Sequence, residues 1–215
     1  MAETVGPPTA GRRGAGSDQA ILDAAKRVFV DDPRATVAAV ANRAGVGMSA
    51  VYRRYASKEE LLRRLCHDGL LRYIDEAERG LAEADPVEGL TRFVTGLVDA
   101  DVHSLTVYLG GTFTPTEEMG DSAMRAGALT NELVDRVRAA GRLRAGAVAE
   151  DVGFILEACA AIRLPDPDRT AALRRRVLTL LLDGFVTGRD VAAALPEPAP
   201  EPGESAWRWR RSPPQ

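Results

Sequence analysis

Cysteine and histidine are both scarce in this chain of 215 residues, which contains two of each. Cys66 and Cys159 are too few for a disulfide framework or a zinc site, so we expect reduced thiols and no metal. His67 and His103 offer little for a catalytic triad, and the general hydrolase pattern G-x-S-x-G is missing. No phosphate loop or dinucleotide fingerprint is present either. The sequence therefore predicts neither an enzyme nor a protein with a cofactor.

Long apolar runs are missing as well. No stretch approaches the roughly 20 apolar residues that a membrane-spanning helix needs. The first residues, MAETVGPPTAGRRG, contain no apolar core and do not look like a secretory signal. We therefore expect a cytoplasmic protein with no membrane partner.

The net charge of −3 is unevenly distributed along the chain. Residues 1–64 contain eleven Lys or Arg against seven Asp or Glu, a balance of +4, which leaves −7 for residues 65–215. This asymmetry indicates that only the first part meets an anionic partner. The stretch GVGMSAVYRRYASKEELLRR, residues 45–64, concentrates the positive charge and interleaves it with Tyr52 and Tyr55.

Composition separates an ordered middle part from two irregular ends. Residues 1–16 are rich in Gly, Pro and small polar residues and predict a flexible arm, and the Pro-rich residues 193–215 predict a disordered tail. From Ser17 onward, apolar residues recur at the 3.6-residue period of an α-helix. Residues 102–113, VHSLTVYLGGTF, have strand-like composition but no visible partner strand, so we interpret them as a helix or helix junction. The predicted fold is all-α.

Helix start and stop signals occur throughout this middle part. Polar N-cap residues satisfy the free N–H groups of a first turn, and a following proline or glutamate strengthens the signal. A glycine after the last turn adopts the left-handed conformation that ends many helices. The predicted N-caps are Thr36, Ser57, Asp85, Thr114 and Asp166, and the predicted glycine stops are Gly45 and Gly141.

Two of these predicted helices are short and closely spaced, which is the arrangement of a helix-turn-helix. Ala41 supplies the small residue that lets two helices cross closely, and Gly45 supplies a turn residue that tolerates positive φ. Val46 and Val51 are apolar anchors that face back toward the first helix. The outward face then carries Met48, Ser49, Ala50, Tyr52 and Arg53, and its small N-terminal end suits a helix that enters a major groove.

Residues 36–62, TVAAVANRAGVGMSAVYRRYASKEELL, resemble the N-terminal signature of TetR-type (TetR/AcrR) transcriptional regulators. The resemblance implies a three-helix DNA-binding domain over residues 17–62 and a larger helical effector-binding and dimerisation domain over residues 63–192. It also implies a one-component regulator, more often a repressor, that binds a palindromic DNA operator as a homodimer. A small-molecule effector would release it from that operator.

The resemblance also assigns DNA contacts by position. Thr36 caps a helix whose N-terminus attracts a backbone phosphate, and Tyr52, Arg54 and Lys58 occupy phosphate-contacting places. Met48, Ser49, Ala50 and Arg53 would face base edges. Because Ala50 has no polar side-chain atom, recognition would use thymine methyl groups, Ser49, Arg53 and DNA shape. Arg12 and Arg13 either reach a minor groove or belong to a solubilising arm.

The larger domain contains candidate residues for an effector pocket and for a dimer interface, and each set has a second interpretation. The apolar and aromatic candidates line an effector pocket or simply form core, and they are Phe93, Leu97, Tyr108, Phe113, Met119 and Met124. His103 either orients a ligand in that pocket or is a satisfied or surface histidine. One predicted helix face forms either the dimer interface, with EDVGFILEACAAIRL (residues 150–164) as partner helix, or intrasubunit core. This face comprises Leu173, Val177, Leu180, Leu181 and Phe185.

Two other classes of function remain as alternatives. GDSAM, residues 120–124, is similar to the nucleophile block of one lipase-esterase group, but that block follows a strand near a chain start, whereas this one lies mid-chain among helices. A helical interaction module without DNA binding is the other alternative. The presence of Tyr52, Arg54 and Lys58 together argues against such a module.

Overall fold

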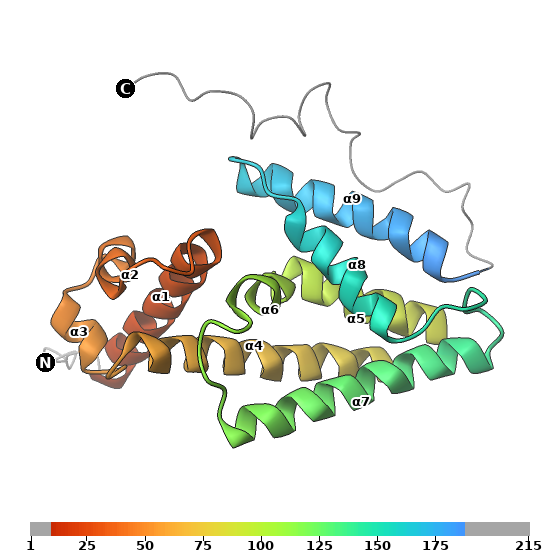
Figure 1. The fold of residues 1–215 in the computed structure, drawn as a ribbon, viewed down its shortest axis with the longest axis horizontal. Helices are drawn as coiled ribbons and strands as arrows, with labels where there is room; N and C mark the ends of the chain where they lie inside the picture. The colour runs from red at the N-terminus through yellow and green to blue at the C-terminus, as the bar shows by residue number, and fades with distance from the viewer. Residues whose placement is uncertain (1–9, 188–215) are drawn as a thin grey trace, which may run out of the picture.

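The computed structural model describes the backbone of residues 10–187, with side chains from Asp18 onward, and this part of the chain is all-α as predicted. An isolated β-bridge between Leu143 and Val186 is its one extended pairing. The helices are α1 (Ala10–Asp31), α2 (Val37–Ala44), α3 (Met48–Tyr52), α4 (Lys58–Leu81), α5 (Pro86–Asp99), α6 (His103–Leu109), α7 (Glu117–Ala139), α8 (Glu150–Ala161) and α9 (Pro167–Phe185). Figure 1 shows α1–α3 as a head at one end of the molecule, joined by the long helix α4 to a body that contains α5–α9.

Most helix boundaries follow the local signals of the sequence. Thr36, Ser57, Asp85 and Asp166 are N-caps whose side chains accept hydrogen bonds from first-turn N–H groups. Gly45 and Gly141 have φ of 67° and 68°, as expected for left-handed residues that follow a helix. Residues 103–109 are helical, which confirms the interpretation of the ambiguous segment as helix.

Two predicted boundaries were wrong. Helix α1 begins at Ala10 rather than Ser17, so residues 10–16 extend a helix where a flexible arm was expected. Pro7 and Pro8 both precede this start, and adding residues to an existing helix costs far less than nucleating one. Helix α7 is capped by Thr116 rather than Thr114, because the backbone of Thr114 is bonded to Glu59 and Arg63 of α4. Residues 1–9 and the predicted tail lie outside the described residues.

Two hydrophobic cores lie along α4. The head core contains apolar residues of α1, α2 and α3 with Leu61, Leu62 and Leu65 of α4, and Leu105 and Leu109 of α6 insert into it. The body core contains Ala77 of α4 with residues of α5, α7, α8 and α9. Because one uninterrupted helix contributes to both cores, a rotation of α4 within the body changes the position of the head.

The body is built around the contacts of α4 with α5 and α7. Helices α4 and α5 cross where Gly80 meets Gly89, and α7 runs along the length of α4 (Figure 1). Helices α8 and α9 pack over α5. Among the described residues, no helix combines the length and apolar character that crossing a membrane requires.

Candidate nucleic-acid interface

The head contains a helix-turn-helix whose turn is fixed by backbone hydrogen bonds. The Thr36 side chain accepts a bond from the Ala39 N–H at 3.3 Å and so caps α2. At the other end of α2, Gly45 takes the left-handed conformation and the Val46 N–H donates to the Ala41 carbonyl at 3.0 Å. Val51 is fully buried in the head core. These contacts hold α3 at one angle to α2.

The outward face of α3 is exposed and partly apolar. Met48 and Tyr52 are 38 % and 49 % exposed, although such large side chains are normally covered in a protein interior. Ser49 and Arg53 are also exposed, and Ala50 is half-buried. The structure thus brings together all the residues predicted to face base edges, on α3 and its C-cap residue Arg53.

Arg54 and Lys58, both predicted phosphate contacts, are engaged inside the head. Arg54 donates to the Ala50 carbonyl at 3.0 Å and lies 3.6 Å from the Asp18 carboxylate. The Lys58 ammonium donates to the carbonyls of Pro33 and Ala35 at 2.7 and 2.8 Å and lies over the Phe29 ring. Both side chains therefore stabilise the head itself, and one donor of the three on the Lys58 ammonium remains for a phosphate.

Asp18 is a residue that the sequence did not single out. Its carboxylate accepts a hydrogen bond from the Tyr55 hydroxyl at 2.8 Å and pairs with Arg54, so it ties α1 to the segment after α3. Burial, together with this acceptor, raises the pKa of Tyr55. Tyr55 lies in the head core. Periodicity alone gave no signal for Asp18, because it lies at the edge of the exposed face of α1.

Arg34 is a second missed residue. It is exposed, and it lies two positions before the Thr36 cap in the loop that leads to α2. A cation there adds to the positive potential of the α2 N-terminus. The signal available in the sequence was a basic residue directly before a predicted helix N-terminus.

The predicted effector-pocket residues are distributed over two cores and the surface. Phe93 and Leu97 are fully buried in the body core, and Met119 is also buried. Tyr108 and Phe113 pack instead against the head core, and Met124 is 70 % exposed. The buried side chains fit the alternative reading as core, and an effector pocket lined by these residues stays a prediction. Apolar periodicity does not distinguish the core of one domain from that of its neighbour.

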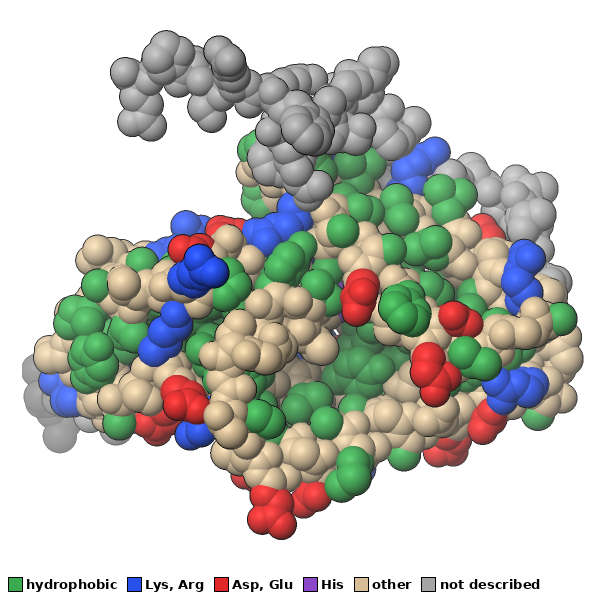
Figure 2. Space-filling view, viewed as in Figure 1, with side chains coloured by type: hydrophobic (Ala, Val, Ile, Leu, Met, Phe, Trp, Pro, Cys, Tyr) green, Lys and Arg blue, Asp and Glu red, His purple; other side chains and the backbone are tan. Residues whose placement is uncertain are grey.

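The space-filling view nevertheless shows a hollow in the body (Figure 2). It lies between the segment that joins α6 to α7, helix α7 and helix α8, and hydrophobic side chains form its floor. Such a recess, apolar and open on one side, is the usual form of a small-molecule site. No group of three or more His, Cys, Asp or Glu side chains suited to a metal ion occurs in the described part of the chain.

His103 is buried next to a charged cluster that contains Asp101. Its side chain is 1 % exposed, Nδ1 lies 3.3 Å from the Leu97 carbonyl, and Nε2 has no hydrogen-bond partner among the described residues. Burial lowers the pKa of His103 to about 4, which the nearby Asp101 carboxylate only partly opposes. The imidazole is therefore neutral at physiological pH.

Ser122 of the GDSAM segment contacts the other histidine. The His67 Nε2 and the Ser122 Oγ are 3.4 Å apart, a long hydrogen bond between α4 and α7. Ser122 lies inside α7, where backbone N–H groups are committed to helical hydrogen bonds and cannot form an oxyanion hole. The contact is thus one between two helices, without the geometry of a catalytic site.

The comparisons with known proteins agree with this geometry. The family model for bacterial regulatory proteins of the tetR family matches residues 21–65, which are the head. The HTH-type transcriptional repressor LfrR of Mycolicibacterium smegmatis is 38 % identical over 96 residues, which cover 42 % of this chain and 48 % of LfrR. In its head, this chain is therefore similar to regulators of the tetR family.

Solved structures of TetR-type regulators extend the likeness to the body. The regulator SCO0520 from Streptomyces coelicolor is 27 % identical, with a TM-score of 0.56 over 79 % of this chain and 99 % of that one. LfrR from Mycobacterium smegmatis, determined in complex with proflavine, has a TM-score of 0.55 at 24 % identity, over 80 % and 99 % of the two chains. The sequence match to LfrR spans about half of its length, whereas the shared fold spans nearly all of it.

The body of the protein also has an exposed apolar face. Of the predicted dimer residues, Leu173 and Phe185 are buried within the protomer, Val177 and Leu181 are half-buried, and Leu180 is 51 % exposed. The prediction therefore mixed two faces of α9. Phe154 of α8, which belongs to the predicted partner helix, is 68 % exposed and lines with Leu180 a groove of about 570 Å³.

Proposed function

We propose that this protein is a TetR-type transcriptional repressor that binds DNA in the cytoplasm. The observation that carries the proposal is the exposed face of α3, where Met48, Ser49, Tyr52 and Arg53 stand out from a rigid helix-turn-helix. In this reading α3 enters the major groove, and the capped N-terminus of α2 binds a phosphate. Tyr52, Arg34 and the remaining donor of Lys58 supply further phosphate contacts.

We propose that base recognition is largely apolar. Met48 and Ala50 offer methyl groups to thymine, and Ser49 and Arg53 are the polar side chains on this face of α3. Because Arg54 is engaged by Asp18 and by the Ala50 carbonyl, it fixes α3 in place. Few direct hydrogen bonds to bases leave a larger share of specificity to DNA shape.

The second part of the proposal is a two-fold homodimer. The exposed groove between α8 and α9, with Phe154, Ala158 and Leu180, is apolar and belongs to two adjacent helices, as a self-complementary interface requires. Each protomer would then present one head. Two heads about 34 Å apart bind successive major grooves on one face of the duplex, which predicts a palindromic operator.

The third part is release by a small apolar effector. The hollow between α7, α8 and the α6–α7 segment has a hydrophobic floor, and α4, which joins head to body, runs through the same domain. LfrR, with which the chain shares its fold, holds proflavine. A ligand that favours a different angle of α4 changes the head separation and lowers operator affinity by population shift.

DNA footprinting across a salt series tests the proposal. The purified protein is incubated with DNA that flanks its own gene, and we expect protection of an inverted repeat whose affinity falls steeply with salt. Arg53→Ala should weaken binding by about 10-fold or more, as expected for loss of a base-contacting arginine. Arg125→Ala, an exposed arginine of α7 in the body, is the matched control and should bind as the wild type does.

Absence of protection on any DNA at low salt would contradict the proposal. In that case the exposed face of α3 would have to serve a protein partner, as in a helical interaction module. Equal loss of affinity in Arg53→Ala and Arg125→Ala would mean that binding depends on overall charge and not on α3.

A further inference from the structure

Asp101 occupies an unfavourable backbone conformation between α5 and α6. Its φ is 52°, and it is the one non-glycine residue with positive φ among the described residues. Aspartate tolerates the left-handed region better than most residues but still rarely adopts it. Such a conformation persists where the surrounding structure over-determines it, and it is frequent in segments that hold or switch a functional part.

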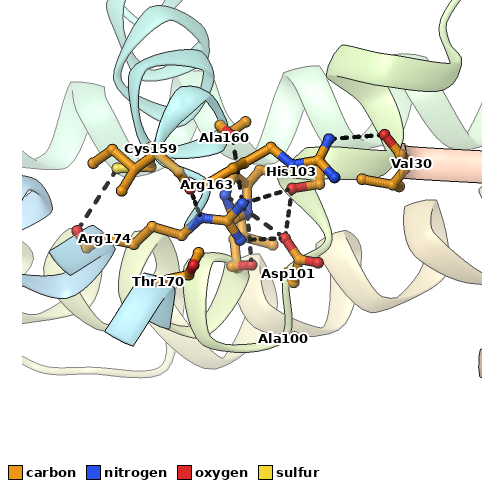
Figure 3. Close-up of polar contacts among 12 residues, drawn as sticks. Val30, Ala100, Asp101, His103, Cys159, Ala160, Arg163, Thr170 and Arg174 are labelled. Atoms are coloured by element: carbon orange, nitrogen blue, oxygen red, sulfur yellow. Dashed lines mark hydrogen bonds and ion pairs between the residues drawn. The ribbon is translucent and has the colours of Figure 1, made fainter. Parts of the chain in front are cut away.

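The Asp101 carboxylate is bonded by side chains from three helices (Figure 3). The Ser104 hydroxyl of α6 donates to Oδ1 at 2.5 Å, and the Arg174 guanidinium of α9 donates to the same oxygen at 2.6 Å. The Lys26 ammonium of α1 lies 3.5 Å from Oδ2 and donates to the neighbouring Ala100 carbonyl at 2.7 Å. One side chain thus joins the head to two helices of the body.

Arg174 is the buried member of this cluster, whereas the side chains of Lys26 and Asp101 are 25 % and 35 % exposed. Arg174 is 7 % exposed and also donates to the carbonyls of Ile162 and Ala160. Burial favours the neutral form of Asp101, but the Lys26, Ser104 and Arg174 contacts outweigh it and hold the pKa of Asp101 below its usual range. The carboxylate is therefore ionised and pairs with Lys26 on one side and with Arg174 on the other.

A second contact crosses the same boundary. Arg163, just after α8, donates to the Val30 carbonyl at 2.8 Å and pairs with Asp31 at the end of α1. Its guanidinium also lies over the ring of Tyr108 in α6, 4.9 Å from the centroid. Between the two contacts is a charged cleft of about 750 Å³ lined by α1, the α5–α6 turn and the start of α9. The C-terminal half of α1 is therefore held by the body at two points, independently of α4.

We propose that Asp101 is a positioning residue that fixes the DNA-reading head at one angle to the body. Lys26 is its head-side partner, and Arg174 anchors it to α9. Because α9 also carries Leu180 of the exposed α8–α9 face, the cluster connects the head to the proposed dimer interface by a path that does not pass through α4. In a dimer it narrows the range of head separations and thereby the range of operator spacings that the protein accepts. This last consequence rests on the proposed function, whereas the fixed angle does not.

The fixed angle is tested on the protein without DNA. Spin labels at Asn42→Cys on α2 and Asn131→Cys on α7, both exposed positions, are placed in a Cys66→Ala, Cys159→Ala background and diluted with unlabelled protein. The distance between the labels is measured by double electron–electron resonance. We expect one narrow distribution in this background and a broadened or shifted distribution when Lys26→Met is added.

Two further variants separate positioning from folding. Asp101→Asn keeps a side chain that tolerates positive φ but removes the charge, and it should broaden the distribution as Lys26→Met does. Arg175→Met breaks an exposed ion pair between α9 and Asp99 of α5, both within the body, and should leave the distribution narrow. If Asp101→Asn fails to fold because Arg174 is left without its partner, Lys26→Met still decides the question, since it leaves the Asp101–Arg174 pair intact.

Operator spacing supplies the second readout. Affinity is measured for the operator and for versions with one or two base pairs inserted between the half-sites. The wild type should bind the lengthened operators much more weakly than the original operator. In Lys26→Met the ratio of the two affinities should be about 5-fold smaller, which is the lower end of the range for coupled sites. Arg175→Met should discriminate as the wild type does.

The outcomes are distinguishable. The inference about Asp101 would be overturned if Lys26→Met gave the same label–label distance and the same narrow distribution as its background. It would also be overturned if wild type and Lys26→Met showed the same ratio of affinities for the original and the lengthened operators. If the wild type binds no operator while Lys26→Met broadens the distribution, the proposed function fails and the positioning role stands.

Discussion

At the scale of single residues, His103 has an unusual environment with a consequence for stability. Its imidazole is neutral in the fold, with a pKa of about 4 because of burial, whereas an exposed histidine in an unfolded chain titrates near 6.5. Between these values the unfolded state binds more protons than the folded state. The free energy of unfolding contributed by His103 is therefore fully present above about pH 6.5 and is lost as the pH falls toward 4.

The first prediction is a pH-dependent loss of stability that depends on His103. The difference between the two pKa values corresponds to about 3 kcal/mol of unfolding free energy between pH 7 and pH 4. His103→Asn offers an amide N–H in place of Nδ1 and does not titrate, so its stability should fall less over this range by about that amount. Urea unfolding at a series of pH values measures this difference, and parallel curves for the two proteins would contradict it.

For the proposed DNA-binding surface, the sequence predicted which side chains are exposed but not which cations are already paired. The basic-aromatic stretch correctly placed Met48, Ser49, Tyr52 and Arg53 on an exposed face of one short helix, because helical period and turn chemistry are local. It did not reveal that Arg54 and Lys58 are bonded to Asp18 and to two carbonyls, since those acceptors belong to other elements. Whether a surface cation is already paired is a property of tertiary structure.

At the scale of elements, the crossing of α4 and α5 depends on two glycines. A Cβ atom at Gly80 would lie 2.6 Å from the carbonyl oxygen of Gly89 and 3.0 Å from Cβ of Phe93, so the two backbones are in direct contact. There is no room for a methyl group unless the helices move apart. The crossing thus sets how closely α5 packs on the helix that carries the head.

The second prediction is that Gly80→Ala destabilises the protein by about 3 kcal/mol, the upper range for overpacking a core. Gly127→Ala is the matched control, because Gly127 lies in α7 with open space around it and alanine favours a helix interior. We expect Gly127→Ala to stabilise by about 0.5 to 1 kcal/mol. Thermal and urea unfolding measure both changes, and equal effects at the two positions would exclude a close backbone contact.

Elements were predicted well where their signals lie within a few residues. The N-caps at Thr36, Ser57, Asp85 and Asp166 follow from side chains that bond to N–H groups of their own first turn. The cap of α7 was misplaced by two residues, since both Thr114 and Thr116 fit the local pattern. Thr116 is the cap because Glu59 and Arg63, from a distant part of the chain, form hydrogen bonds with the backbone of Thr114.

At the scale of the whole molecule, the structure shows which residues of the predicted α8–α9 face are exposed. Period alone grouped Leu173, Leu180 and Phe185, yet the first and last are buried within the protomer. The face that remains exposed contains Phe154 and Leu180. Which side of an apolar helix meets its own protomer depends on how the helices stack, and this stacking was not visible in sequence.

The third prediction concerns assembly through this face. Phe154→Glu should convert a dimer into monomers at micromolar concentration, because it places a charge in the apolar centre of the proposed interface. Leu71→Glu is the control, since Leu71 is 46 % exposed on α4 and lies outside the face. Sedimentation velocity gives the masses. A wild-type monomer, or a Phe154→Glu dimer as stable as the wild type, would contradict the assignment.

The central claim is sequence-specific DNA binding by the head, and selection from a random DNA library tests it most directly. The full chain is incubated with random duplexes at low salt, and the bound fraction is amplified and sequenced over several rounds. We expect enrichment of an inverted repeat whose half-sites are about one helical turn apart, and loss of that enrichment in Arg53→Ala. A bound fraction with no shared sequence, or no bound DNA at all, would contradict it.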